Sequence, residues 1–174
     1  MKTTDSLEVW QRGPVEGVPG LLQPVAHALL QSAEDVEKFS AAMPDDLLWQ
    51  KPGGVASVGF HLLHIRGVID RLFTYARGES LTSLQLMALT AEKEILTGAN
   101  AGDLLKALDS QVEQAIDQLR QTPESSLLEP RALGRKRIPT TVLGLLFHAA
   151  EHCQRHTGQL LVTARVLQAG MTSA

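Results

Sequence analysis

Apolar residues recur every three or four positions through most of this chain, a spacing that restricts the fold to packed helices. It predicts four long helices, at residues 25–43, 55–77, 103–121 and from 139 or 140 to 169, and a weaker one within 83–96. Alternation of apolar and polar residues over strand lengths is scarce. Because long helices with short connections pack as bundles, we expect an all-α protein, an antiparallel four-helix bundle with a short extra helix.

Two segments are expected to be irregular. Residues 10–24 carry many glycines and prolines, which predicts a loop within an N-terminal arm at residues 1–24. The stretch 123–139 also reads as a loop and holds the only basic run, from Arg131 to Arg137. We favour a solvated loop there over a clamp for an anionic ligand. The length of 174 residues fits a single domain, residues 1–174.

Charge and composition exclude several classes of partner. Sixteen Lys and Arg against nineteen Asp and Glu give a net charge of −3, so nucleic acid is not an expected partner. No apolar run approaches the roughly 20 residues that a membrane-spanning helix needs, and the first residues lack the apolar stretch of a signal peptide. We therefore expect a soluble, cytoplasmic protein that acts on a small-molecule substrate.

Five of the six histidines lie in two groups on predicted helices: His61 and His64, then His148, His152 and His156. Residues four apart lie on one helix face, so His152 and His156 can direct two imidazoles at one ion, with one of the first pair as the third ligand. Three imidazoles on a divalent ion leave a position for water or substrate, as in catalytic sites. Imidazole suits zinc, nickel, iron or copper, so the ligands alone do not select the ion. The alternative is that these histidines are buried as packing residues.

A second pattern overlaps this group. The segment from His148 to His152 matches the H-x-x-E-H pattern of zinc peptidases, in which two histidines hold zinc and the glutamate, here Glu151, activates water. No Asp or Glu follows Glu151, so the downstream acidic ligand of such enzymes is missing. Glu151 stays a weak catalytic candidate. Cys153, the single cysteine, is expected to be a packing residue, and no nucleotide-binding motif is present.

Two motifs resemble those of the DinB-like (YfiT-like) family of metal-dependent enzymes. The first comprises Trp49 to Pro52, then Ser57 to Gly59, then His64. The second, His152 to Gln159, is similar to that family's closing H-x-x-x-H-R-G-Q helix, except that Thr157 replaces the arginine. The resemblance spans roughly residues 21–167.

This resemblance implies an up-down-down-up bundle, often a homodimer, with a three-histidine site for one divalent ion per chain. His64, His152 and His156 match the ligands, and zinc or nickel is the expected ion, with manganese or iron as further options. Around the ion we expect His61, His148 and Gln159 to line the pocket, the two histidines on its open side.

The expected function is that of a metal-dependent hydrolase or of an S-transferase using a low-molecular-weight thiol, since related proteins carry out thiol-dependent chemistry. The sequence does not separate these two reactions. The alternative is a non-catalytic bundle that binds a metal or a small ligand.

Overall fold

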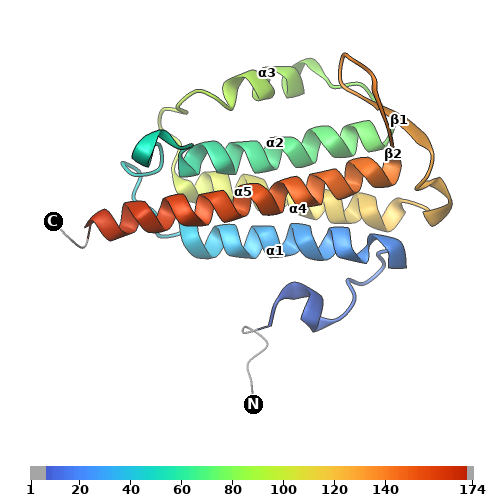
Figure 1. The fold of residues 1–174 in the computed structure, drawn as a ribbon, viewed down its shortest axis with the longest axis horizontal. Coiled ribbons are helices and arrows are strands. Elements are labelled where there is room, and N and C mark those ends of the chain that lie inside the picture. Colours follow the sequence, from blue (N-terminus) through green and yellow to red (C-terminus); the bar gives the residue numbers. More distant parts are fainter. Residues whose placement is uncertain (1–6, 172–174) are drawn as a thin grey trace.

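The computed structural model describes residues 7–171 and is mainly helical. The elements, drawn in Figure 1, are helices α1 Gln23–Ser40, α2 Val58–Ala76, α3 Ser83–Ala91, α4 Ala101–Gln121 and α5 Val142–Met171, and strands β1 Pro130–Leu133 and β2 Ile138–Thr141. Short 3-10 turns occupy Val9–Arg12, Gly20–Leu22, Pro52–Gly54 and Glu124–Ser126. The four long helices and the shorter one confirm the helical prediction.

Four helices form the bundle. Figure 1 shows that α1 and α5 run in one direction and that α2 and α4 run in the other, which is the up-down-down-up arrangement. Both α4 and α5 pack against α1 and against α2. One continuous apolar core lies between these helices, and its largest fully buried side chains include Leu29, Ile65, Phe73, Leu108 and Leu146. The bundle also holds the facing sides of α2 and α5 in contact.

Local chemistry sets the helix ends. The Ser57 side chain caps α2 by accepting a hydrogen bond from the Phe60 amide, and Gly78 follows α2 with a φ of 81° that suits glycine. The Asn100 side chain caps α4 in the same way, so this helix begins two residues earlier than predicted. The weaker helix, α3, is shorter than expected and ends at Ala91.

The predicted N-terminal arm is ordered where the structure describes it; its residues 1–6 lie outside the described residues. Val9 is buried and its amide donates to the Gln31 side chain, while Arg12 pairs with Glu34 of α1 at 2.6 Å. The arm is shorter than predicted because α1 begins at Gln23. Pro24 falls in the first turn of the helix, where its missing N–H is not needed.

The prediction of a loop at residues 123–139 was partly wrong, because β1 and β2 pair there as an antiparallel hairpin. Pairing of residues 138–141 delays the start of α5 to Val142, and the helix continues through Gly170. Arg131 of the basic run is engaged, since its Nε donates to the Ala76 carbonyl at 2.8 Å and its Nη2 pairs with Glu129 at 3.0 Å. This arginine therefore fastens the hairpin to the end of α2.

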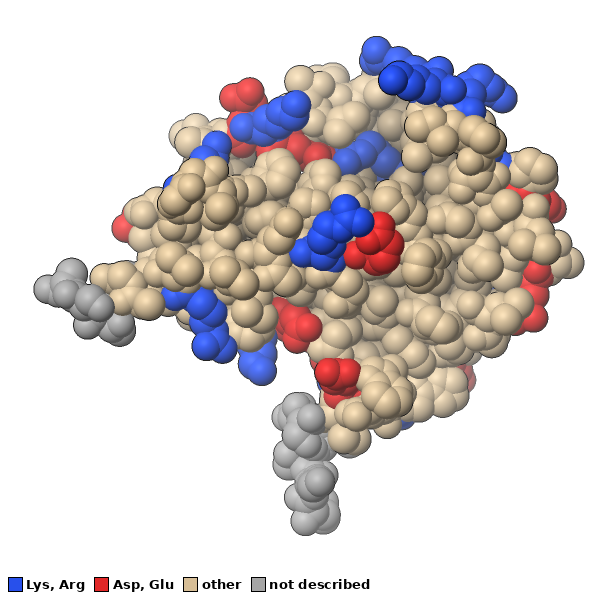
Figure 2. All heavy atoms as spheres, in the orientation of Figure 1, with Lys and Arg blue, Asp and Glu red and all other residues tan. Residues whose placement is uncertain are grey.

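The surface carries no single dominant charge on the face drawn in Figure 2, where acidic and basic side chains are scattered over a mainly uncharged surface. A basic group stands at the upper right, where Figure 1 places the hairpin. Among the helices in the described part of the chain, none has both the length and the apolarity needed to cross a membrane.

Candidate metal centre

Three histidines converge where α2 and α5 face each other. His64 comes from the second turn of α2, and His152 and His156 stand one turn apart on α5. One ring nitrogen from each lies within 4.8 Å of the other two. The ring centroid of His156 lies 4.4 Å from that of His64 and 4.6 Å from that of His152. The structure thus brings together the three residues that the resemblance designated as ligands.

The donor set fits a divalent ion. Nε2 of His64 lies 3.0 Å from Nε2 of His152, and two imidazole ligands on a tetrahedral ion, each bound at about 2.0–2.1 Å, lie roughly 3.3 Å apart. Nδ1 of His152 is buried and has no hydrogen-bond partner within residues 7–171. Nε2 of the same ring faces His64, so Nε2 is the nitrogen of His152 that would bind an ion, and Nδ1 points away from it.

The electrostatic environment keeps the rings of His152 and His156 neutral. Burial, with the neighbouring histidines as the next cause, lowers the pKa of His156 to about 4, and the same causes lower the pKa of His152. Burial and the His64 ring lower the pKa of His61 to about 4. Because a metal competes with protons for the imidazole nitrogens, neutral rings at neutral pH are in the form that binds an ion.

Sequence reasoning missed Glu92, the residue after α3, which contacts the cluster from outside the bundle. One carboxylate oxygen lies 2.8 Å from Nδ1 of His64, and the other accepts a short hydrogen bond from Arg71. Glu92 is buried, with 6% of its surface exposed. No spacing signal links it to His64, because the two residues are 28 positions apart and their contact depends on how α3 folds over α2.

The three residues predicted to surround the ion do not share one pocket. His61 is buried on α2, with Nδ1 3.1 Å from Nδ1 of His156, and it borders a cleft of about 500 Å³ that Gln159 also lines. His148 borders a different cleft, of about 310 Å³, together with His64 and His152. Direct access to two of the three candidate ligands is therefore through the cleft at His148.

Glu151 is engaged in ion pairs. Its carboxylate lies 2.7 Å from Nδ1 of His148 and accepts two hydrogen bonds from Arg155. Desolvation raises the pKa of Glu151, but the contacts with Arg155 and His148 outweigh it and lower the pKa overall. Glu151, His148 and His152 form a second, more exposed group with metal-ligating spacing. A carboxylate already paired with an arginine is a weak base, so Glu151 gains little support as a catalytic residue.

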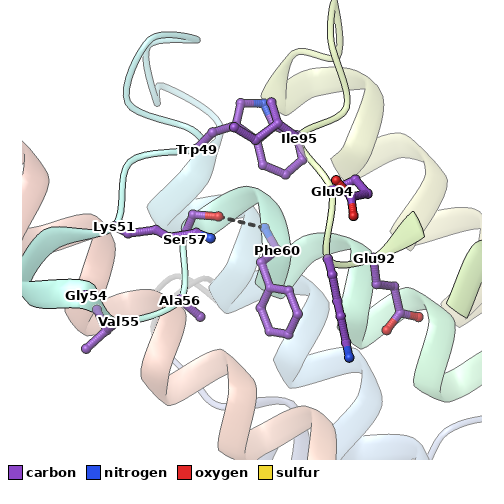
Figure 3. Close-up of a pocket in the computed structure, with 11 residues that line it drawn as sticks. Trp49, Lys51, Gly54, Val55, Ala56, Ser57, Phe60, Glu92, Glu94 and Ile95 are labelled. Carbon is purple, nitrogen blue, oxygen red and sulfur yellow. Dashed lines mark hydrogen bonds between the residues drawn. The ribbon is translucent and has the colours of Figure 1, made fainter. Parts of the chain in front are cut away.

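Phe60 covers the cluster on a third side. Its ring is stacked on that of His64, with centroids 5.2 Å apart and planes 11° from parallel. Figure 3 shows Phe60 of α2 and Glu92 lining a third cleft, of about 290 Å³, below the Trp49 indole. Trp49 lies against Gly59, where a side chain would clash with the indole. Trp49, Lys51 and Ser57, which belong to the first of the two family motifs, therefore line the cleft next to the candidate site.

The fold and the cluster define a class of protein: a helical bundle with a three-histidine group able to bind a metal. The model of the DinB superfamily matches residues 28–160, and the chain belongs to this superfamily. The crystal structure of a conserved protein from Enterococcus faecalis is similar, with a TM-score of 0.66 and 19% identity over 85% of this chain and 97% of that one. At this identity the likeness shows the fold. No curated protein matches.

Proposed function

We propose that His64, His152 and His156 bind one divalent metal ion, zinc or nickel, and that the protein is a metal-dependent hydrolase or a thiol-dependent S-transferase. The convergence of one nitrogen from each of these residues within 4.8 Å carries the proposal. A bound ion would supply Lewis acidity, lowering the pKa of a water molecule or of a thiol that it coordinates.

The cleft at His148 is the proposed substrate site. It offers about 310 Å³, at the small end of ligand pockets, and it reaches His64 and His152. Apart from Arg71 and Gly134, its remaining walls are apolar or aromatic, formed by Val68, Leu72, Tyr75, Leu81, Leu89 and Leu133. These walls would bind the apolar body of a small molecule and exclude bulk water from it. His148, with Nδ1 held by Glu151, stands where it can exchange a proton with that molecule.

Elemental analysis of protein purified without chelator or affinity nickel tests the metal site. We expect about one ion per chain, lost in His64→Ala and in His156→Ala. His27→Ala is the matched control, because His27 lies on α1 and its ring contacts the Gly13 carbonyl, outside the cluster. Protein that takes up no zinc, nickel, manganese or iron on reconstitution would refute the site.

Activity is tested on the metal-loaded protein with small apolar esters and electrophiles, with and without low-molecular-weight thiols. Turnover that requires a thiol supports the transferase, whereas turnover without one supports the hydrolase. Turnover that persists in His156→Ala at the wild-type rate would rule out either reaction at this site.

A bundle that binds a metal or a small ligand without turnover is the second candidate. The burial of His61 and the stacking of Phe60 on His64 favour it, because both restrict access to the cluster on their sides. Stoichiometric metal binding without turnover would support it. The homodimer implied by the resemblance also stays a prediction, which light scattering tests.

A further inference from the structure

The contact between Glu92 and His64 supports a role that reaches beyond packing. We infer that Glu92 is the positioning residue of the metal centre, fixing the orientation and the tautomer of His64 so that Nε2 is available to an ion. This inference rests on the proposed metal site. A carboxylate oxygen of Glu92 lies 2.8 Å from Nδ1 of His64, while Nε2 of the same ring lies 3.0 Å from His152.

The chemistry of the pair selects one tautomer. A carboxylate only accepts hydrogen bonds, so the contact with Glu92 places the ring proton on Nδ1. When the ring is neutral, its lone pair is then on Nε2, the nitrogen that faces His152. Carboxylates that hold metal-binding histidines in this way fix the ring and increase its basicity, and their loss typically lowers metal affinity about 10–100-fold.

The surroundings of Glu92 are built to hold this carboxylate in place. Arg71, also buried, donates to its second oxygen, which leaves the first oxygen for His64. Gly67 lies one helical turn before Arg71, and a Cβ there would overlap the Glu92 carboxylate and approach Nη1 of Arg71 to 2.5 Å. The absence of a side chain at position 67 is therefore what lets the pair lie against α2.

The segment that delivers Glu92 is anchored separately. The Gln85 side chain of α3 donates to the Asp70 carboxylate and to the Thr74 hydroxyl of α2, at 2.8 Å each. These contacts hold α3 over α2 without involving a histidine. Glu92 can therefore be changed while the rest of α3 keeps its attachment.

Two variants test the inference. Glu92→Ala removes the carboxylate, and Gly67→Ala keeps it but displaces it, because the atoms that clash are the far ends of flexible side chains. Glu94→Ala is the charge-matched control, since Glu94 is exposed and two residues away. Gly170→Ala controls for the helical substitution, because nothing lies within 4 Å of a Cβ at position 170.

Zinc affinity is measured by competition with a chromogenic chelator, and the tautomer of His64 by two-bond ¹H–¹⁵N NMR correlations of the metal-free protein. We expect wild-type His64 to carry its proton on Nδ1. Zinc affinity should fall about 10–100-fold in Glu92→Ala, and it should also fall in Gly67→Ala. In both variants a His64 protonated on Nε2 should appear. The two controls should keep the wild-type affinity and the wild-type tautomer.

The outcomes separate this inference from the proposed function. Wild-type protein that binds no zinc overturns both. Zinc affinity in Glu92→Ala within twofold of wild type overturns the inference alone. A weaker affinity with the Nδ1 tautomer unchanged also overturns it, by assigning the effect to charge. If Glu92→Ala does not fold, as its circular dichroism would show, Gly67→Ala decides by the same two measurements.

Discussion

Acidification should destabilise the metal-free protein through His61. This ring is 2% exposed and lies between Phe60 and His156, so the folded protein holds it in the neutral form. Burial and His64 lower its pKa to about 4, against 6.5 for a solvated histidine. Below pH 6.5 the unfolded chain therefore binds a proton that the folded chain does not, and the equilibrium shifts toward unfolding.

The size of the effect follows from the two pKa values. Each unit of difference corresponds to about 1.4 kcal/mol, so the full loss, complete below the folded pKa, is about 3 kcal/mol. Between about pH 7.5 and about pH 5, most of the unfolded chains become protonated and most of the folded ones do not. The free energy of unfolding should fall by about 2 kcal/mol over this interval from His61 alone.

Urea unfolding of metal-free protein at these two pH values, followed by circular dichroism, measures the effect. His61→Asn is the informative variant, because its amide lies near the place of Nδ1 and can retain a hydrogen bond to His156, yet it does not titrate. We expect the variant to lose about 2 kcal/mol less than wild type over the same interval. Equal losses in the two proteins would refute the assignment to His61.

Three further substitutions or treatments test other parts of the structure. Gly59→Ala should lower the free energy of unfolding by about 1–3 kcal/mol, because its Cβ would lie 2.7 Å from Trp49 ring carbons; an unchanged melting temperature would contradict this packing. Arg71→Met should cost about 3–5 kcal/mol by leaving the buried Glu92 carboxylate without its cation, and urea unfolding that shows less than 1 kcal/mol would exclude a buried pair. Cys153 is fully buried, and burial raises its pKa to about 12, so a thiol reagent at about pH 8 should label one thiol per chain only after unfolding. Rapid labelling of the native protein would show that the thiol is accessible.

Helical spacing predicted most of the fold because apolar positions alone decide which face of each helix is buried. The helix ends were less accurate where a side-chain cap or a tertiary contact decides them. The Asn100 cap places the start of α4 at Ala101, before the predicted start, and the hairpin places the start of α5 at Val142, after the predicted start. Each strand of the hairpin has only four residues, which is too few positions for a pattern of alternating apolar and polar residues to be recognised.

The candidate site was predictable only in part. His152 and His156 share a helix, so their spacing fixed their relation, while the choice of His64 over His61 depended on the family resemblance. In the structure both residues contact the histidines of α5: Nε2 of His64 lies next to Nε2 of His152, and Nδ1 of His61 lies next to Nδ1 of His156. Glu92 could not be predicted, because its position depends on the path of the chain outside the bundle rather than on any helical repeat.

The position of α3 keeps the segment that delivers Glu92 to the candidate site apart from the bundle core. None of the nine residues of α3, all within the described part of the chain, is buried, and Figure 1 shows the helix lying outside the bundle alongside α2. The segment that ends in Glu92 thus contributes little to the core. Exchanging α3 for another sequence is therefore a way to adjust how Glu92 meets His64 at the candidate site while leaving the packing of the bundle helices intact.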